Sequence, residues 1–169
     1  ISRGGERISA GSPISLGDRL VSNETGEGVI VFLDESTARM GPNADLTIDE
    51  FVYDPDRRTG TVRLRQTQGI SRIFGGQISK RGTAEVRTPH IVLGVRGGIA
   101  DLEIGGGETV ATLRGGIMTC SAGGTTRRVT NPGISCASDG QSLRLGQFAG
   151  AGPLIQPVDP GAPASSSGR

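Results

Sequence analysis

Short segments in which apolar and polar side chains alternate recur along the chain, at a spacing of roughly ten residues. In one of them, Val62 and Leu64 alternate with Arg63 and Arg65. Successive side chains of a strand point to opposite faces, so such a segment buries its aliphatic side chains and exposes its charges. No stretch of ten residues keeps apolar side chains at helical spacing without an interrupting Gly or Pro. The pattern therefore predicts an all-β protein.

The alternating segments place the strands. They predict strands at 19–22, 28–33, 36–40, 46–53, 61–67, 70–74, 84–88, 91–95, 99–104, 109–114, 117–120, 126–130, 134–136 and 142–145. Within 46–53 the apolar side chains change from one set of alternate positions to the other, which predicts a bulge near Asp49 and Glu50.

The composition limits how these strands pack. Gly supplies 29 of 169 residues, hydrophobic residues 34% and aromatic residues 3%. Many short strands with Gly at the corners and a lean core predict an irregular β-solenoid or a twisted two-sheet sandwich. We expect one β domain over 1–147 and an extended tail rich in Gly, Pro and Ser over 148–169.

The charges are sorted along the chain although the net charge is only +1. Residues up to Asp56 include 11 acids and four arginines, whereas the rest include 14 bases and six acids. Such asymmetry favours head-to-tail contact between copies or capture of a polyanion. Two ordinary solvated faces would explain it as well.

Several of the bases lie in or between consecutive predicted strands. If those strands are neighbours, the bases form a candidate interaction face for phosphate, an anionic glycan or an acidic protein surface. Single-stranded nucleic acid normally needs aromatic stacking platforms, which this chain hardly contains, so we expect no nucleic-acid partner. A solvated face is the alternative. The candidate residues are Arg63, Arg65, Arg72, Lys80, Arg81 and Arg87, with Arg96 on the next strand.

No catalytic or cofactor-binding pattern is found. The single His, His90, is the one candidate imidazole base, and its position between Pro89 and an apolar strand favours a structural role. The chain has no nucleophile elbow, phosphate-binding loop or dinucleotide-binding motif. One His and two Cys cannot form a structural zinc site. We therefore predict a protein that is not an enzyme, with no metal and no cofactor.

The two cysteines predict a disulfide. Fifteen residues separate Cys120 from Cys136, and closing such a loop stabilises a fold by about 3 kcal/mol. An even number of cysteines in an all-β chain favours an oxidising compartment. Two buried free thiols in a cytosolic protein remain the alternative. No apolar run approaches the roughly 20 residues of a membrane-spanning helix, so we expect no membrane span.

Five elements in one order resemble the FecR domain of bacterial cell envelopes. Each element by itself encodes only strands and turns, but five in sequence make the match specific, although Gly98 stands where that family often has Thr. The elements are 16–22, 29–37, 40–48, 86–89 and 94–98, and they span about half of the chain.

The resemblance implies a non-catalytic β domain in the periplasm or outside the cell. The best-known members are iron-uptake regulators with a cytoplasmic anti-sigma segment and a membrane helix, whereas other members are exported proteins that stand alone. We expect this chain to be of the second type, with its signal peptide removed. Its predicted role is contact with other envelope or extracellular proteins as a scaffold or structural subunit, with a second copy as a further partner. A sensory, receptor-coupling module and a polyanion- or glycan-binding module are the alternatives.

Overall fold

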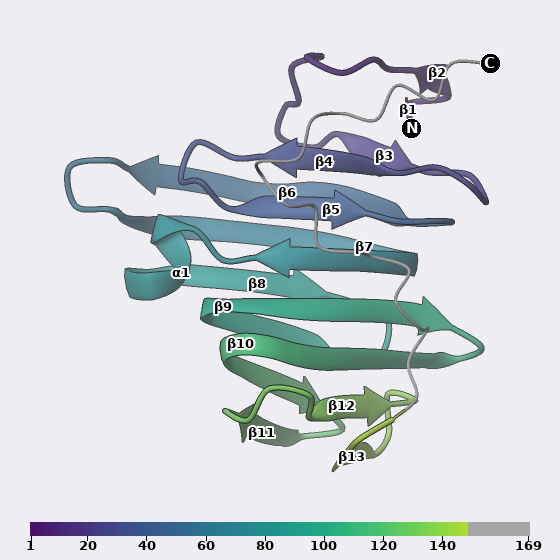
Figure 1. Ribbon diagram of the computed structural model, residues 1–169, viewed down its shortest axis with the longest axis vertical. Coiled ribbons are helices and arrows are strands. Elements are labelled where there is room, and N and C mark those ends of the chain that lie inside the picture. The colour runs from purple at the N-terminus through teal and green to yellow at the C-terminus, as the bar shows by residue number, and fades with distance from the viewer. Residues whose placement is uncertain (149–169) are drawn as a thin grey trace.

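Figure 1 shows the computed structural model, which describes residues 1–148. The predicted tail, apart from Phe148, lies outside these residues. The elements are β1 (Ser2–Arg3), β2 (Glu6–Arg7), β3 (Arg19–Val21), β4 (Gly28–Val31), β5 (Thr37–Met40), β6 (Asp45–Asp54), β7 (Thr59–Phe74), α1 (Gln77–Arg81), β8 (Thr83–Arg87), β9 (Val92–Gly105), β10 (Glu108–Ala122), β11 (Thr125–Val129), β12 (Ser135–Ser138) and β13 (Leu143–Gly146).

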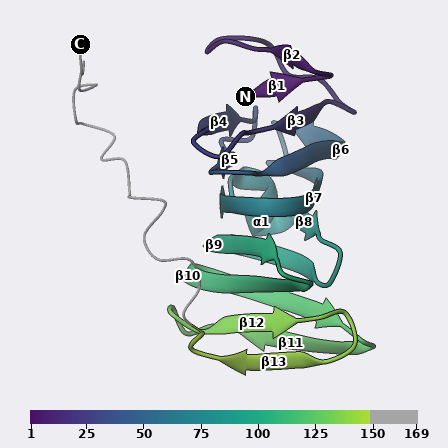
Figure 2. The same ribbon diagram turned by 90° about the vertical axis from the view of Figure 1, so that its right-hand side faces the viewer.

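The strands form one open sheet that folds over on itself into two layers (Figures 1 and 2). The first layer contains β2, β1, β3, β6, the first half of β7, β8, the first half of β9, the second half of β10, and β11. The second layer contains β4, β5, the second halves of β7 and β9, the first half of β10, β12 and β13. The predicted all-β class is confirmed, and the two layers belong to one continuous sheet.

The three long strands pass from one layer to the other at glycines with positive φ angles. These are Gly69 in β7 (φ +82°), Gly97 in β9 (φ +55°) and Gly116 in β10 (φ +70°). The buried positions change phase there, so that in β9 Leu93 is buried before the bend and Leu102 after it. Because glycine adopts a left-handed φ at little cost, the chain turns a corner without leaving the sheet.

The bends of β9 and β10 lie against each other. A Cβ atom on Gly116 would come closer than 3.0 Å to the Cα of Gly98 and to the carbonyl of Gly97. A Cβ on Gly98 would likewise approach the carbonyl oxygen of Gly115 too closely. The two strands therefore cross between the layers backbone against backbone, which requires glycine on both.

One hydrophobic core lies between the layers. Leu46 and Leu93 from the first layer, and Met40, Leu102 and Leu113 from the second, are completely buried in the same cluster. Each fully buried aliphatic side chain stabilises the fold by about 1.5–3 kcal/mol. The core is almost entirely aliphatic, as the composition indicates.

Several predicted segments belong to longer strands. The pairs 61–67 and 70–74, 91–95 and 99–104, and 109–114 and 117–120 are continuous in β7, β9 and β10, so separating them was wrong. The predicted bulge in β6 is confirmed, because the pairing with β7 changes register between Ile48 and Glu50. The short strands β1 and β2 were not predicted.

The short helix α1 was not predicted either. It lies between β7 and β8, and the side chain of Asp34 holds it in place. Asp34 is completely buried in the turn between β4 and β5, and its carboxylate accepts hydrogen bonds from the backbone N–H of Ile78 (3.1 Å) and of Ser36 (3.1 Å). Five residues are too few to produce a helical periodicity in the sequence.

Candidate functional site

A row of directly opposed residues crosses the outer face of the first layer. Opposed residues point to the same side of a sheet, so these side chains share the solvent face. The row consists of Glu50 of β6, Arg63 of β7, Glu85 of β8, Gly94 of β9, Thr119 of β10 and Arg128 of β11.

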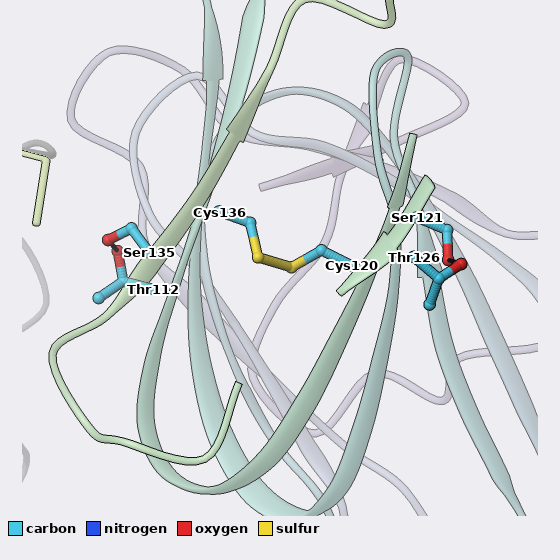
Figure 3. The surroundings of a disulfide bond; sticks show 6 residues. All are labelled: Thr112, Cys120, Ser121, Thr126, Ser135 and Cys136. Atoms are coloured by element: carbon cyan, nitrogen blue, oxygen red, sulfur yellow. Dashed lines mark hydrogen bonds between the residues drawn. A yellow bond between two sulfur atoms is a disulfide. The ribbon is translucent and has the colours of Figure 1, made fainter. Parts of the chain in front are cut away.

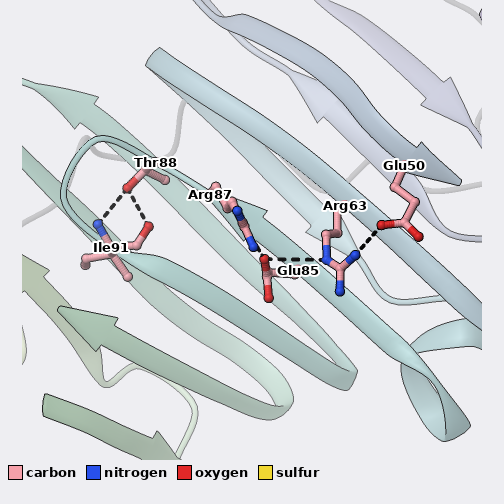
Figure 4. A network of polar contacts seen from close by, with 6 residues as sticks. All are labelled: Glu50, Arg63, Glu85, Arg87, Thr88 and Ile91. Carbon is pink, nitrogen blue, oxygen red and sulfur yellow. Dashed lines mark hydrogen bonds and ion pairs between the residues drawn. The ribbon is translucent and has the colours of Figure 1, made fainter. Parts of the chain in front are cut away.

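Ion pairs fill one half of this row (Figure 4). Arg63 donates a hydrogen bond to Glu50, and its Nε lies 3.8 Å from Oε1 of Glu85. Arg87 donates to the same Glu85 oxygen at 2.7 Å, and this bond raises the pKa of the Arg87 guanidinium. Four charges thus neutralise one another along three strands.

The turn from β8 to β9 follows directly after Arg87, beside this network (Figure 4). The hydroxyl of Thr88 donates to the carbonyl of Ile91 at 2.8 Å and accepts from the Ile91 N–H at 2.9 Å. These bonds fix the turn, and with it the ends of the strands that carry Arg87 and Gly94.

The outer face of the second layer has its own charged centre at Asp101. Its carboxylate accepts hydrogen bonds from Arg72 (2.5 and 2.8 Å) and Arg114 (2.7 Å). Burial alone would raise the pKa of Asp101, but the bonds from the two guanidinium groups outweigh it and lower the pKa below its ordinary value. Asp101 therefore stays ionised and joins β7, β9 and β10.

The predicted basic face is divided between three places. Arg63, Arg65 and Arg87 lie on the first layer, each with a carboxylate partner, since Arg65 donates to Asp49 at 2.6 Å. Arg72 lies on the opposite layer with Asp101. Lys80 and Arg81 are exposed on α1; no ion pair within residues 1–148 involves either. The structure thus does not gather the six into one stripe, and a binding role for them stays a prediction.

The charge asymmetry along the chain is largely neutralised in space. The acidic first part includes β6 and the basic part includes β7, and β6 is paired with the first half of β7. Ion pairs of Glu50 with Arg63 and of Asp49 with Arg65 cross that boundary. Within residues 1–148, arginines without an ion pair remain at Arg58 in the β6–β7 turn and farther along the sheet, on β9 and β11.

A hollow in the first layer collects such charge. It has a volume of about 640 Å³, and exposed Arg81, Arg96 and Arg128 are among its lining residues. None of these three arginines forms an ion pair with a carboxylate of the described chain. Gly94 lies in its lining, in the middle of the row described above. Sequence reasoning did not select Arg128, because its neighbourhood depends on the pairing of β10 with β11.

His90 is engaged in a hydroxyl network. Its Nδ1 lies 3.0 Å from the hydroxyl of Thr109, which is 3.1 Å from the hydroxyl of Thr88. Thr109 is completely buried, so its hydroxyl is not presented to a substrate. The geometry supports the structural role for His90 that its sequence position indicates.

The predicted disulfide is present and joins the two layers (Figure 3). Cys120 lies in the second half of β10, in the first layer, and Cys136 lies in β12, in the second layer. Hydroxyl pairs flank the bridge, Thr112 with Ser135 (2.7 Å) in one layer and Ser121 with Thr126 (2.8 Å) in the other. The bridge thus joins the two layers at the end of the molecule formed by β11, β12 and β13.

Metal-binding clusters and membrane-spanning helices are both absent from the described part of the chain. Residues 1–148 contain no group of three or more His, Cys, Asp or Glu side chains placed to hold a metal ion. They also contain no helix with the length and apolar character needed to cross a membrane.

The five FecR-like elements shape turns and bends. The hydroxyl of Ser22 donates to the carbonyl of Gly41 (2.6 Å) and accepts from the N–H of Ala44 (2.8 Å), which ties two of the elements together. Asp34 secures the helix, and Gly97 and the glycine after it form the crossing between layers. The resemblance therefore rests on residues that determine the fold.

Comparison with known proteins gives a likeness of fold. No protein-family model and no curated protein matches the sequence, so the FecR resemblance is not extended to membership. Two crystal structures of a "putative anti-sigma factor" from Parabacteroides distasonis, at 2.50 and 1.65 Å resolution, superpose with TM-scores of 0.62 and 0.61 at 12% and 11% identity. Each match covers 76% of this chain but only 59% of the other. The chain therefore has the fold of part of those anti-sigma factor structures.

Proposed function

We propose that this chain is a non-catalytic β module that acts by protein–protein contact in cell-envelope signalling. The observation that carries the proposal is the fold likeness to the anti-sigma factor structures over three quarters of the chain. The five FecR-like sequence elements support it independently, because that family includes signalling proteins of the same kind. In this role the module receives a signal from one protein and passes it to another by contact, without chemistry.

Deletion in the source organism tests the signalling role. Removing the segment that encodes residues 1–148 should change the transcriptional response to envelope stress or nutrient limitation, and the intact chain supplied in trans should restore it. A variant with Gly69→Val serves as a control, because a Cβ there would meet the backbone of Asn43 and the bend of β7 would not form. An unchanged transcriptome under every condition would contradict the proposal.

A scaffold role is the second candidate, and the edge strand β4 favours it. Val29 and Val31 on this strand and Leu33 just after it are 57%, 72% and 84% exposed. Three exposed aliphatic side chains on an edge strand suit the addition of a strand from another chain. Size-exclusion chromatography with light scattering, run on the wild type and on Val31→Lys over a range of concentrations, should then show an assembly that the substitution dissolves. A wild type that is monomeric at every concentration would argue against this role.

The same proposal places the protein in the periplasm or outside the cell. The disulfide supports this location, because such bonds persist in oxidising compartments. Dissolving whole cells in a denaturant that contains a maleimide polymer, with and without prior reduction, tests it. We expect Cys120 and Cys136 to react only after reduction and unfolding, and reaction without reductant would contradict the placement.

A further inference from the structure

We propose that the hollow lined by Arg81, Arg96 and Arg128 binds an acidic segment of another polypeptide. We call it the arginine hollow. The inference rests on the proposed function, contact with other proteins, and names the chemistry of one contact surface.

The arginine hollow carries positive charge that the rest of the fold leaves uncompensated. Its three arginines are exposed, and no carboxylate of residues 1–148 pairs with any of them. Glu85 also lines the hollow, but Arg63 and Arg87 already flank its carboxylate. Arg7, Arg58 and Arg127 also have no ion pair within the described chain, but only Arg81, Arg96 and Arg128 come together in the lining of this hollow. A guanidinium fork fits a carboxylate through two parallel hydrogen bonds.

Gly94 belongs to the lining of the hollow and has no side chain of its own. The hydroxyl of Thr119, its neighbour in the row, lies 2.5 Å from the position that a Cβ on Gly94 would take. Thr83 and Thr119 place hydroxyl groups on its lining, which can donate to the same anionic groups. An open, polar depression of about 640 Å³ accommodates several side chains of an extended segment.

The lining favours a polypeptide over a nucleic acid or a sugar polymer. It contains no aromatic side chain among the described residues, so bases and sugar rings have no surface on which to stack. The strands of Arg96 and Arg128 are two apart, about 10 Å, and the two residues are offset by two positions along the strands. Carboxylates on alternate residues of an extended peptide repeat about every 7 Å, within the reach of two long arginine side chains.

The test measures binding of a fluorescein-labelled decaglutamate peptide to the full chain by fluorescence anisotropy at low and physiological salt. We expect saturable binding that weakens with salt. Arg128→Ser should weaken it at least about fivefold, and Arg96→Ser with Arg128→Ser at least about twentyfold. The matched control is Arg127→Ser, which removes the same charge from the neighbouring position of β11, where the side chain points to the other face of the strand.

Gly94→Ser provides a second perturbation that changes no charge. Its added Cβ would meet only the flexible hydroxyl of Thr119, so the variant should fold. We expect it to weaken decaglutamate binding, because the added side chain displaces the hydroxyl of Thr119 and takes up space in the hollow. Unfolding curves are recorded for all variants to establish that each one is folded. Equal losses from Arg127→Ser and Arg128→Ser would overturn the proposal, since net charge alone would then explain binding. No binding of decaglutamate, or binding of a heparin fragment in its place, would overturn it too.

The outcome separates this inference from the function on which it rests. If decaglutamate binds as described while the deletion leaves transcription unchanged, the hollow is an acidic-peptide site and the proposed signalling role is wrong. If the deletion alters transcription while decaglutamate does not bind, signalling stands and the hollow is not the contact surface.

Discussion

The crossing of β9 and β10 makes a sharp prediction about stability. Gly116→Ala changes one hydrogen into a methyl group at the point where the two strands pass between layers. Gly124→Ala, on the open turn from β10 to β11, is its matched control. Gly124 has nearly the same φ (+76° against +70°), but nothing lies within 4 Å of the position that its Cβ would take.

The two substitutions share one cost and differ in another. A left-handed φ costs a non-glycine residue about 1–2 kcal/mol, and both variants bear it. Only at position 116 does the new methyl also overlap the backbone of Gly97 and Gly98. Overpacking of this kind costs about 1–3 kcal/mol, and backbone atoms cannot rotate away as a side chain can. We therefore expect Gly116→Ala to destabilise by about 2–5 kcal/mol and Gly124→Ala by about 1–2 kcal/mol.

Urea unfolding followed by far-ultraviolet circular dichroism measures both free energies, with the slope m compared to confirm two-state behaviour. Gly98→Ala, whose Cβ would meet the carbonyl of Gly115, bears the overlap cost without the left-handed φ and should destabilise by about 1–3 kcal/mol. If Gly116→Ala and Gly124→Ala lose the same stability, the strands do not cross glycine against glycine, and the account of the bend is wrong.

Three further predictions concern contacts between the layers and around the sheet. Cys120→Ala with Cys136→Ala should lower the free energy of unfolding by about 3 kcal/mol, and the same reductant that destabilises the wild type should leave this variant unchanged. Asp101→Asn should cost about 2 kcal/mol at neutral pH, because Arg72 and Arg114 lose their charged acceptor. The pKa of Asp101 is lowered in the folded protein, so its contribution to the free energy of unfolding is complete above about pH 5 and disappears as the pH falls below about 3.9 towards the folded pKa. The free energy of unfolding of Asp101→Asn should therefore depend less on pH in this range than that of the wild type. Asp34→Ala should cost about 2 kcal/mol and speed hydrogen exchange in α1, because the buried N–H of Ile78 loses its acceptor; unchanged exchange there would contradict the role of Asp34.

The sequence predicted the strands well and their continuity poorly. Alternation in 61–67 and in 99–104 identified the correct buried faces, because burial on one side of a strand imposes period two. At Gly69, Gly97 and Gly116 the alternation breaks, and a break beside glycine is typical of a turn between strands. Here the same signal marks a bend inside a strand, and only the pairing on both sides of it distinguishes the two cases.

The candidate site was predictable only in part, because it depends on which strands are neighbours. Arg63 and Glu85 are 22 positions apart and meet through the parallel pairing of β7 with β8, which no local pattern reveals. The pairing of acids with bases across this face removed most of the predicted basic surface. The disulfide, by contrast, was predictable from the sequence, because the chain has only two cysteines and they can pair only with each other.

The division between fold and function follows from where the two kinds of residue lie. The FecR-like elements supply turns, bends and caps, such as Ser22, Asp34 and Gly97, which any chain with this sheet needs. Of the arginine hollow, Arg81 and Arg128 lie outside those elements, whereas Gly94 and Arg96 lie inside the fifth, and all three arginines are exposed. A fold retained at 12% identity can therefore keep its crossings while its outer face changes from one partner to another. On this reasoning, grafting the hollow's three arginines together with Gly94 onto another protein of this fold should transfer decaglutamate binding with little change in stability, because the arginines occupy exposed positions.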